Sequence, residues 1–581
     1  MAGTERCLSR QQGNQRLRVA LAQINSIVGD FAGNQSNILQ ALAHCQSRTA
    51  RLIVFPELAL TGYPPEDLLF KRSFIKANFN ALEAIIPAVG DCVALIGCVE
   101  RDERGRLYNA AAVICRQKLM GFYRKAKLPN FGVFDERRYF TPGSDPLIVG
   151  VGGVRIGLAI CQDLWEKESV HYRADYVQSV SILASLSASP FHMGKQLLRQ
   201  KMVTSLARRI GAAVIYQNLV GGQDELVFDG GSLIADPAGR LIGRAARFEE
   251  DILIADVPVR PASSLGPPPA GVRTLSLPIA FGSVKKSHST KSRLSPSLGP
   301  DEEVYRALVL GTRDYILKNG FQKVLIGLSG GIDSALVARI AVDALGPRQV
   351  IAVTMPSPFT SSQTLADAKR LARQLGIVCF ELRINEVFEA YLTTLKPAFE
   401  GTVSGVAEEN LQARIRGNLL MALSNKYGYL VLTTGNKSET ATGYCTLYGD
   451  MAGGFAVIKD VPKTTVYRLA RYRNRIYPKR SIAQSIIARA PTAELKIGQK
   501  DQDTLPPYAI LDRFIRAYIE QDLSVEQIVK EGIASATIAK KIARMTDLNE
   551  YKRRQAPPGI KITPKAFGRD RRMPITNRFV Q

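Results

Sequence analysis

A glycine-rich turn between an apolar run and a helical segment constrains the fold of this chain more than any other feature. Residues 323–329 read KVLIGLS, and residues 330–346 continue as GGIDSALVARIAVDALG. The first segment has the length and the β-branched content of a buried strand. The segments QVIAVTMP, QTLADAKRLARQLG and IVCFELRI come next. The order strand, helix, strand, helix, strand predicts a doubly wound parallel sheet.

The turn itself, GLSGGIDSA at residues 327–335, has the properties of an anion site. Its backbone N–H groups can converge on a phosphate, and the N-terminus of the following helix adds positive potential. Gly330 and Gly331 let the backbone approach such a ligand closely. The lysine of the familiar P-loop is absent, and a glycine pair alone is also typical of an ordinary strand-to-helix turn.

The N-terminal part of the chain predicts a second α/β domain. Residues 17–258 repeat short apolar runs bounded by polar turns, among them LRVALAQI, RLIVFPELAL and VRIGLAIC. Helical stretches at 35–47 and 195–210 lie between some of these runs. A chain of 581 residues is long for a single core. We therefore predict one domain at 17–260 and another at 301–581, which opens with the amphipathic helix EEVYRALVLGTRDYILKNG.

The segment between these domains, residues 261–300, is rich in Pro, Ser and Gly and predicts a linker or a long mobile loop. The chain carries a formal net charge of +25, and residues 260–300 hold six Lys or Arg and no acid. A solvated basic loop and a nucleic-acid contact both fit this composition. No aromatic-interleaved RNA motif accompanies the charge, so we predict no nucleic-acid partner.

Cysteine usage and hydropathy limit the class of protein further. The eight cysteines include no CxxC pair, so the sequence indicates neither a zinc site nor a disulfide framework. No apolar run approaches the roughly 18 to 20 residues of a membrane helix, and the N-terminal stretch is polar. We expect a cytoplasmic enzyme without a membrane partner.

Three residues of the N-terminal domain suggest nucleophilic chemistry. Glu57 follows the apolar run RLIVFP, Cys161 follows VRIGLAI, and Lys125 lies between them in YRKAKLPNF. A carboxylate can accept the thiol proton, while an ammonium group favours the thiolate and a tetrahedral oxyanion. The four histidines are too dispersed to offer a Cys-His alternative. The sequence therefore predicts a cysteine nucleophile with a carboxylate base.

This trio resembles the Glu-Lys-Cys triad of the nitrilase, or carbon-nitrogen hydrolase, superfamily. The resemblance implies an α-β-β-α sandwich and an auxiliary acid at Glu136 in FDERRYF. Lys127 competes with Lys125 for the lysine role, and the family spacing of three residues before LPN selects Lys125. Lys127 is then a neighbouring charge.

The turn at 327–335 resembles the SGG-x-DS signature of the ATP pyrophosphatase superfamily, whose sheet is of the adenine nucleotide alpha hydrolase-like type. The resemblance implies that the loop holds the β and γ phosphates of ATP as a leaving group, so AMP is transferred. Asp333 would hold part of the magnesium. The implied ATP-binding residues of the loop are Gly327, Leu328, Ser329, Gly330, Gly331, Ile332, Asp333 and Ser334.

Together the two halves resemble the glutamine-dependent NAD synthetases along essentially the whole chain. In the first half, SASPFHMGK and GGQDELVFDGGS resemble glutamine-site segments, which implies that Ser189 and Lys195 contact the glutamine carboxylate and amine. The aromatic residue after LPN is Phe131 where that family usually has Tyr. Gln162 stands after the nucleophile where an acid is common.

In the second half, the block EENLQARIRGNLLMALSNKYGYLVLTTGNKSETATGYCTLYGD carries the resemblance. It implies that Asn410 and Arg414 contact deamido-NAD, Thr434 contacts ATP, and Glu439 holds magnesium with Asp333 beside the deamido-NAD site. Further implied contacts come from VIKD and from the C-terminal segment ITPKAFGRDRRMPITNRF. They are Lys459 and Asp460 in the two nucleotide pockets, and Lys565, Arg571 and Arg572 facing phosphates.

The resemblance implies hydrolysis of glutamine to glutamate and ammonia, and amidation of deamido-NAD through an adenylated intermediate with release of AMP and pyrophosphate. It also implies ATP as co-substrate, Mg²⁺ as cofactor and a homo-oligomer. Amidotransferases that make guanine nucleotides or asparagine pair the same loop with other glutaminases. An RNA-modifying enzyme, or an interaction scaffold, would leave the glutamine segments or the filled catalytic positions without a role.

Overall fold

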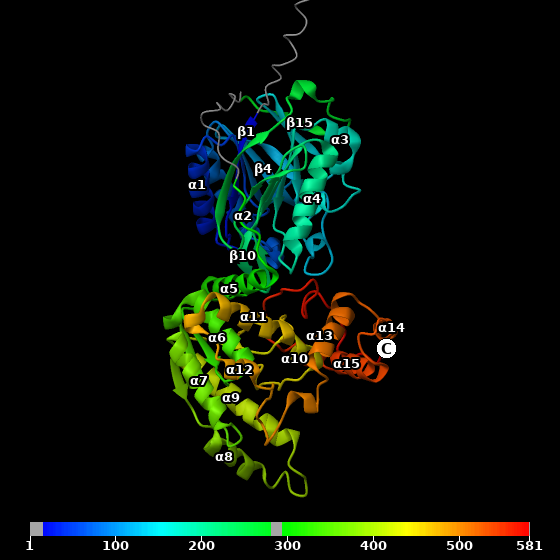
Figure 1. The fold of residues 1–581 in the computed structure, drawn as a ribbon. Coiled ribbons are helices and arrows are strands. Elements are labelled where there is room, and N and C mark those ends of the chain that lie inside the picture. The colour runs from blue at the N-terminus through cyan, green and yellow to red at the C-terminus, as the bar shows by residue number, and fades with distance from the viewer. Residues whose placement is uncertain (1–15, 280–292, 580–581) are drawn as a thin grey trace, which may run out of the picture. The chain divides into compact units, whose positions relative to one another are not determined.

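The computed structural model describes residues 16–279 and 293–579, and the chain divides into two compact units (Figure 1). The first unit comprises Met1–Gln223 and Phe228–Ser297, and the second comprises Asp224–Val227 and Leu298–Gln581. Among the helices described, none is both long enough and apolar enough to cross a membrane.

Two β-sheets form the centre of the first unit. The six-stranded sheet has the order β14 (Asp251–Pro258), β1 (Arg16–Gln23), β2 (Leu52–Val54), β3 (Val93–Arg101), β4 (Leu107–Cys115) and β5 (Lys118–Arg124). The seven-stranded sheet has the order β13 (Leu241–Arg244), β12 (Leu233–Ala235), β9 (Ala213–Asn218), β8 (Ile182–Ser187), β7 (Val154–Ile160), β6 (Leu147–Val151) and β15 (Arg273–Ser276). Strands β1, β2 and β3 are parallel, as are β7, β8 and β9.

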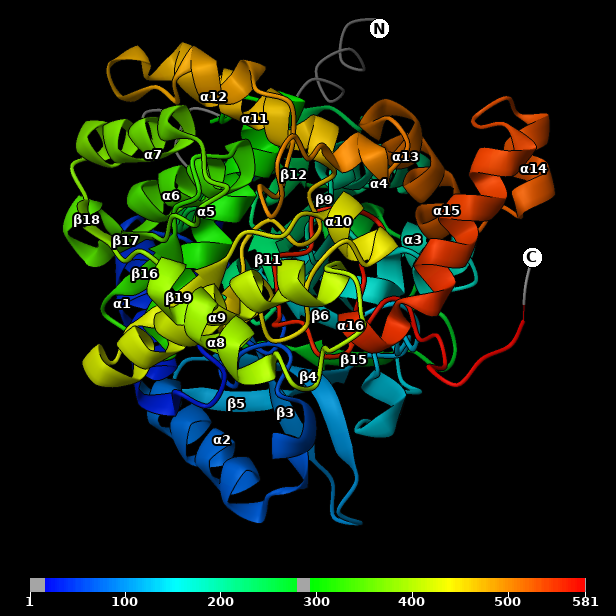
Figure 2. The same cartoon turned by 90° about the horizontal axis from the view of Figure 1, so that it is seen from below.

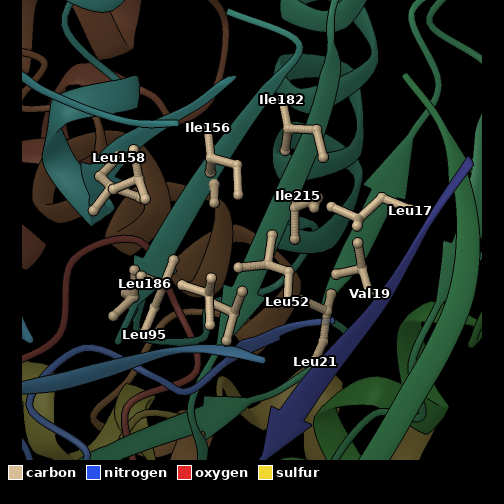
Figure 3. Close-up of a cluster of buried hydrophobic side chains, with 14 of the residues drawn as sticks. Leu17, Val19, Leu21, Leu52, Leu95, Ile156, Leu158, Ile182, Leu186 and Ile215 are labelled. Atoms are coloured by element: carbon tan, nitrogen blue, oxygen red, sulfur yellow. The ribbon is translucent and has the colours of Figure 1, made fainter. Parts of the chain in front are cut away.

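The alternation of side chains along each strand explains how the two sheets pack. Leu17, Val19 and Leu21 of β1 all belong to one buried cluster with Ile156 and Ile215 of the other sheet (Figure 3). Successive residues of a strand point to opposite faces. Central strands such as β1, β7, β8 and β9 are buried along nearly their whole length, because both faces of each sheet are covered there.

Helices cover the outer faces of the two sheets. Helix α1 (Phe31–Ser47) and α2 (Arg72–Ile85) pack on the six-stranded sheet through Ile38, Leu42 and Leu82. Helix α4 (Lys195–Ile210), with the short α3 (Ala174–Gln178), covers the seven-stranded sheet. This order of layers confirms the predicted α-β-β-α sandwich. A hairpin of β10 (Val220–Gln223) and β11 (Leu226–Asp229) extends the chain beyond β9.

The segment predicted as a linker is partly ordered structure. Strand β15 pairs in parallel with β6, at the edge of the seven-stranded sheet. Residues 280–292 of this segment lie outside the described residues. Helix α5 (Pro300–Lys318) then opens the second unit, beginning at a proline, which is favourable at the first helical position.

The second unit is built on a five-stranded parallel sheet. Its order is β18 (Val378–Glu381), β17 (Val350–Thr354), β16 (Val324–Gly327), β19 (Leu430–Thr433) and β20 (Phe455–Ala456). All four strand pairs are parallel. This sheet confirms the doubly wound fold that the strand and helix order predicts.

Helices lie on both faces of this sheet (Figure 2). One layer holds α6 (Ile332–Leu345) and α7 (Ser362–Leu375), with α5 beside α6. The other holds α8 (Asn385–Leu395) and α9 (Val406–Tyr427), whose apolar residues form one cluster with those of β16, β17 and β19. The remaining helices are α10 (Lys437–Thr442), α11 (Lys463–Ile476), α12 (Gln484–Ala488), α13 (Tyr508–Ile515), α14 (Val525–Lys530), α15 (Ala536–Leu548) and α16 (Glu550–Arg553).

A buried ion triad supports the first unit. Asp229 lies between the guanidinium groups of Arg199 and Arg247, and Asp229 and Arg199 are both fully buried. Burial opposes ionisation of Asp229, but the two guanidinium groups outweigh it and lower the pKa of the carboxyl. The triad is therefore charged, and removal of its anion leaves two buried cations facing each other.

We expect Asp229→Ala to destabilise the protein by about 3–5 kcal/mol, because unpaired buried charges are costly. Urea-induced unfolding followed by circular dichroism measures the change. Asp175→Ala is the matched control, since it breaks an ion pair with Arg173 whose two side chains are about half exposed, and its midpoint should stay near that of the wild type. Equal unfolding midpoints for the wild type and both variants would contradict the stabilising role of Asp229 in the buried triad.

Candidate active sites

The three nucleophile-site residues predicted from sequence each stand just after a strand of the first unit. Glu57 follows β2, Lys125 follows β5 directly, and Cys161 follows β7 directly. All three side chains are buried. Each residue lies just C-terminal to a strand, and the sheet hydrogen bonds of that strand fix its backbone. The three side chains are therefore held in a defined arrangement at the end of the sandwich.

Lys125 lies between two carboxylates. Its Nζ is 2.6 Å from Glu57 Oε1 and 2.7 Å from Glu136 Oε1. The predicted auxiliary acid, Glu136, therefore contacts the predicted lysine directly. Burial opposes the charged form of Lys125, but the carboxylates of Glu136 and Glu57 outweigh it and raise the pKa of the lysine. Lys125 is therefore a fixed cation rather than a base.

Further hydrogen bonds fix the two acids. Asn109 Nδ2 donates to Glu57 Oε1 at 2.8 Å, and the backbone N–H of Ala188 donates to Glu57 Oε2 at 2.9 Å. Tyr63 donates from its hydroxyl to Glu136 Oε1 at 2.9 Å. Sequence reasoning missed Asn109 and Tyr63. Asn109 is the polar residue within the strand LYNAAAVIC, a signal that could have identified it.

Cys161 has an unusual backbone. Its φ angle is +43°, in the left-handed region that non-glycine residues rarely adopt, and it begins the short 3₁₀ helix Cys161–Leu164. Such a conformation costs on the order of 1–3 kcal/mol and is retained where the surrounding structure enforces it. Asp163 supplies part of that support, because it accepts hydrogen bonds from the backbone N–H of Ile160 at 2.8 Å and from Tyr123 at 2.7 Å.

The two candidate lysines, Lys125 and Lys127, have different surroundings, and Asp163 contacts the backbone of Lys127. It accepts a hydrogen bond from the backbone N–H of Lys127 at 2.8 Å, while the Nζ of Lys127 lies 3.3 Å from Glu166 in a partly exposed ion pair. Lys125 is the one that faces the carboxylates. Gln162 donates to Glu166 Oε1 at 3.4 Å.

The electrostatics of this site favour a thiol that ionises only during reaction. Burial and the charge of Glu57 raise the pKa of the Cys161 thiol, whereas Lys125 and Lys195 lower it. Burial raises the pKa of Glu136 to about 7. The cluster can therefore take a proton from a cysteine and stabilise an oxyanion, which is what attack on an amide carbonyl requires.

The predicted glutamine-binding residues lie in different surroundings. Ser189 is buried, and its backbone N–H donates to Asn218 Oδ1 at 2.9 Å. Lys195 begins α4, and its Nζ lies 4.1 Å from the centre of the Trp165 ring. Phe131 is 58% exposed and packs edge-on against Phe134. Its ring is therefore available to a ligand.

In the second unit, the predicted loop joins β16 to α6. Gly330 has φ +85°, and a Cβ there would lie 2.3 Å from the backbone oxygen of Thr364, so only glycine fits. The side chains of Ser329 and Ser334 share a hydrogen bond of 3.0 Å, and the N–H of Gly331 donates to Ser329 Oγ at 3.2 Å. These hydrogen bonds support the loop at the start of a helix, where its backbone N–H groups can bind an anion.

Asp333 and Glu439, the predicted metal ligands, meet at one buried lysine. Lys463 Nζ is 2.5 Å from Asp333 Oδ2 and 3.2 Å from Glu439 Oε1. Asn436 caps α10 and also donates to Asp333 Oδ1 at 3.0 Å. Burial opposes the charge of Lys463, but Asp333 and Glu439 outweigh it and raise its pKa. Burial raises the pKa of Glu439 to about 7.

A cavity of about 290 Å³ adjoins this cluster. The loop forms one of its walls, with the predicted Thr434 at the end of β19 and with Arg416 of α9. The pKa of Arg416 is lowered to about 10 by burial. The cavity thus combines a cradle of backbone N–H groups, a carboxylate pair and cations, which suits a nucleoside phosphate.

The structure places the predicted deamido-NAD residues as follows. Asn410 accepts a hydrogen bond of 2.7 Å from Thr446, and Arg414 donates to the backbone oxygen of Leu447 at 3.3 Å. Both side chains come from α9. Lys459 lines a second, smaller cavity, together with Thr434 and Glu439, and its Nζ donates to the backbone oxygen of Pro557 at 2.7 Å.

Several predicted residues in or next to the C-terminal segment have partners within the protein. Lys565 pairs with Asp522 at 2.5 Å. Asp460, expected in a nucleotide pocket, is buried and accepts hydrogen bonds from Ile562 and Thr563, while Lys437 forms an ion pair with it.

Arginines of the C-terminal segment also have protein partners. Arg571, expected to face phosphates, is buried against Asp547 and Glu550. Arg572 is exposed and donates to the backbone oxygen of Arg569. Asp460 and Arg571 thus anchor the C-terminal segment, Asp460 by accepting hydrogen bonds from it and Arg571 by pairing with acids outside it.

An α-β-β-α sandwich with a buried carboxylate-lysine-cysteine site, joined to a parallel sheet with a phosphate loop, defines a two-domain amidotransferase. The family model described as carbon-nitrogen hydrolase matches residues 18–264, and that described as NAD synthase matches residues 304–556. The chain belongs to the family of glutamine-dependent NAD(+) synthetases.

Relatives that align over nearly their full length support this family assignment. The chain is 48% identical to the glutamine-dependent NAD(+) synthetase of Thermotoga maritima, over 97% of this chain and 99% of that protein. It is 45% identical to that of Aquifex aeolicus, over 97% and 100%. A solved structure from Acinetobacter baumannii, in complex with ADP, is 39% identical over 97% of this chain and 99% of that chain, with a TM-score of 0.75.

Proposed function

We propose that the first unit hydrolyses glutamine to glutamate and ammonia, and that the second unit amidates deamido-NAD to NAD in an ATP-dependent reaction. The observation that carries this proposal is the presence, in one chain of this family, of the Glu57–Lys125–Glu136 cluster beside Cys161 and of the phosphate loop beside Asp333. Each site supports one half of the reaction.

In the first unit, Cys161 attacks the amide carbon of glutamine while Glu57 accepts the thiol proton. Lys125 stabilises the tetrahedral oxyanion, and Glu57 returns the proton to the departing ammonia. Water then hydrolyses the glutamyl thioester, which releases glutamate and restores the thiol. In the proposed complex, Ser189 and Lys195 bind the carboxylate and amine of glutamine, and Phe131 packs on its side chain.

In the second unit, the nicotinate carboxylate of deamido-NAD attacks the α-phosphate of ATP. The loop at 327–334 binds the β and γ phosphates, which leave as pyrophosphate, and Thr434 contacts the nucleotide. Ammonia then attacks the acyl carbon, and AMP leaves with the former carboxylate oxygen. The dinucleotide contacts in this scheme are Asn410, Arg414, Glu439, Lys459 and Lys565.

Asp333 and Glu439 are the residues that would hold magnesium. Mg²⁺ binds commonly through one or two carboxylates together with substrate phosphates, and these two carboxylates converge at the edge of the loop, on Lys463. The donor set therefore fits the ion. When bound, Mg²⁺ offsets the negative charge that accumulates on pyrophosphate.

The proposal includes a cytoplasmic location and a homo-oligomeric state. Both rest on the family resemblance and on the reactants, which are nucleotides and glutamine. Light scattering of the purified protein tests the second: a mass near twice 63.6 kDa or above supports it, and a mass near 63.6 kDa at micromolar concentration contradicts it.

A product assay tests the proposed function. Purified protein incubated with glutamine, deamido-NAD, ATP and Mg²⁺ should yield glutamate, NAD, AMP and pyrophosphate in equal amounts when the two half-reactions are coupled. Omission of deamido-NAD should abolish AMP formation. NAD formation with ADP and inorganic phosphate as the nucleotide products would contradict the adenylation chemistry.

Glutamine hydrolysis should depend on the charge of Glu136. Because burial raises the pKa of Glu136 to about 7, this carboxyl is ionised above that pH and takes up a proton below it. Protonation removes one of the two anionic partners of Lys125, so the rate should fall as the pH falls through that value. Glu136→Gln should lower the rate about tenfold or more and remove this part of the pH profile.

Glutamate release measured from one pH unit below that value to one unit above it checks this prediction. Lys127→Ala, which alters the neighbouring partly exposed pair, should keep the wild-type profile. A profile of the Glu136→Gln variant that still falls at the same pH would show that another group titrates there.

A further inference from the structure

One buried carboxylate of the first unit accepts hydrogen bonds from segments that belong to both sheets of the sandwich. It is the carboxylate of Asp163, which is 0% exposed and lies two residues after Cys161 in a short 3₁₀ helix. Four neutral groups donate hydrogen bonds to its two oxygens. They are the backbone N–H groups of Ala126 at 3.1 Å and Lys127 at 2.8 Å on Oδ1, and the backbone N–H of Ile160 at 2.8 Å and the hydroxyl of Tyr123 at 2.7 Å on Oδ2.

The four donors flank the lysine and the nucleophile of the candidate site. Tyr123 lies in β5, two residues before Lys125, and the N–H groups on Oδ1 belong to the two residues that follow Lys125. The fourth donor, the N–H of Ile160, belongs to the residue directly before Cys161. Strand β5 is part of the six-stranded sheet, and β7 is part of the seven-stranded sheet. Asp163 thus fixes the lysine segment against the nucleophile segment across the two sheets.

This position requires a carboxylate if all four hydrogen bonds are to be kept. An ionised carboxylate has two acceptor oxygens, and each can accept two hydrogen bonds, whereas an amide has one acceptor oxygen and an NH₂ group that only donates. In an Asp163→Asn protein, the NH₂ group would therefore face two of the four donors in either orientation. Hydrogen bonds to a charged group are worth about 1.5–3 kcal/mol each, so the loss of two releases one of the two segments.

The contact with Ile160 also bears on the strained backbone of the nucleophile. Cys161 has a φ angle of +43°, and such a conformation persists only where the surrounding structure enforces it. The N–H of Ile160 is held by Asp163 on one side of this residue, and Asp163 itself stands on the other side in the same 3₁₀ helix. Cys161 therefore lies between two anchored points of the chain.

We propose that Asp163 is a positioning residue for glutamine hydrolysis, which sets the distance between the ammonium group of Lys125 and the thiol of Cys161 by binding the backbone beside each of them. Attack on an amide needs the ammonium group at the oxyanion and the thiol at the carbonyl carbon at the same time. Asp163 itself takes no part in proton transfer. This inference rests on the proposed glutaminase function, and it adds a residue that the triad does not include.

Steady-state glutamate release by the full-length wild type and by Asp163→Asn tests the inference. Because a misplacement of about 1 Å can cost 10²-fold in rate, kcat should fall about 100-fold. The KM for glutamine should stay within about twofold, since Ser189 and Lys195, the proposed glutamine contacts, belong to segments other than those that donate to Asp163. NAD formation from ammonia should be unchanged. An unchanged kcat in a folded protein, or a parallel loss of the reaction with ammonia, would overturn the inference.

The charge of Asp163 offers a competing explanation, which the same variant separates. Removal of a negative charge near a thiol favours the thiolate. If Asp163 acted through its charge alone, Asp163→Asn would ionise Cys161 more easily, and glutamate release would rise or stay level. The positioning role predicts a fall at every pH measured. The other charges that act on the thiol are the same in both proteins: Glu57, Lys125, Glu136 and Lys195.

Tyr123→Phe removes one of the four donors and leaves every charge in place. Burial and the charge of Asp163 raise the pKa of the Tyr123 phenol, so this group is protonated and can donate. Its loss should lower kcat about tenfold, which corresponds to one hydrogen bond to a charged group. The double variant should be about as slow as Asp163→Asn alone, because both changes act through one contact. Effects that multiply fully would overturn the inference. A folded Tyr123→Phe protein with the wild-type kcat would also overturn it, and this result decides the matter if Asp163→Asn fails to fold.

Asp236→Asn is the matched control. Asp236 is a buried carboxylate of the same unit that directly follows a strand, β12, and it accepts hydrogen bonds from the backbone N–H groups of Ala238 at 3.0 Å and Arg240 at 2.9 Å. Strand β12 is antiparallel to β9, so Asp236 lies at the end of the sheet opposite to Cys161. This variant should keep the wild-type kcat. A loss as large as that of Asp163→Asn would overturn the inference.

A readout that needs no glutamine separates this inference from the proposed function. Alkylation of Cys161 by iodoacetamide is followed against pH in the wild type and in Tyr123→Phe, with mass spectrometry of the peptide that carries this residue. Lys125 lowers the pKa of the thiol, so a less well placed ammonium group should raise the midpoint, by about half a pH unit. An unchanged midpoint would overturn the inference. Failure of the wild type to release glutamate would contradict the proposed function separately.

Discussion

Replacement of Cys161 by Ala should abolish NAD formation from glutamine, by about 10⁴-fold or more, and leave NAD formation from ammonium salts near the wild-type rate. Cys161 is the proposed nucleophile of the first unit, and it directly follows β7, at the end of the sandwich that holds Lys125 and Glu57. The phosphate loop and Asp333 belong to the second unit, which the substitution does not touch. Rates measured with each nitrogen source in the same preparation give the comparison.

Cys98→Ala is the control for this experiment. Cys98 is also a buried thiol of the first unit, in β3. It should retain both activities. Loss of both activities in a folded Cys161→Ala protein would contradict the assignment of the two half-reactions to separate sites.

Asp333→Asn should reduce NAD formation by about 10³-fold with either nitrogen source. The substitution removes one of two carboxylates that face Lys463 and leaves the phosphate loop without its adjacent anion. Glutamine hydrolysis, measured as glutamate release in the absence of the other substrates, should persist. Asp333→Asn should thus lose the reaction of the second unit and keep that of the first, whereas Cys161→Ala should lose the reaction of the first unit and keep that of the second.

Asp301→Asn provides the matched control in the same unit, because Asp301 forms a partly exposed ion pair with Arg468. Its rates should stay close to those of the wild type. If Asp333→Asn kept full activity with ammonia while its fold and melting temperature were unchanged, the proposed metal and phosphate site would be wrong.

The residues of the candidate nucleophile site could be named from the sequence because they leave a local signal. Glu57 and Cys161 each follow an apolar run, and the loop at Gly330 and Gly331 stands between a strand and a helix. Strand ends and glycine turns are read from a few neighbouring residues. The resemblance then added Glu136, which the structure places 2.7 Å from Lys125.

Residues that act through distant partners could not be predicted in this way. Lys463 is 130 positions from Asp333, and nothing in VPKTTVYR distinguishes it from any lysine at the start of a helix. The same limit applies to the protein partners of Arg571, which the resemblance implied as a phosphate ligand. Its acidic partners, Asp547 and Glu550, lie on a separate stretch of chain.

The ordered part of the predicted linker has a different explanation. Strand β15 has the sequence RTLS and is largely exposed, so it lacks the alternating apolar pattern of a buried strand. Its pairing with β6 depends on backbone hydrogen bonds, which any sequence without proline can make. The Pro, Ser and Gly content of residues 261–300 therefore predicted a loop or linker and gave no sign of β15.

The transfer of a carboxylate oxygen from deamido-NAD to AMP tests the central claim most directly. Deamido-NAD labelled with oxygen-18 in its nicotinate carboxylate is incubated with the full-length protein, ATP, Mg²⁺ and glutamine, and the products are analysed by mass spectrometry. Attack on the α-phosphate predicts one labelled oxygen in each AMP and none in pyrophosphate. Labelled inorganic phosphate with unlabelled adenine nucleotide would contradict it.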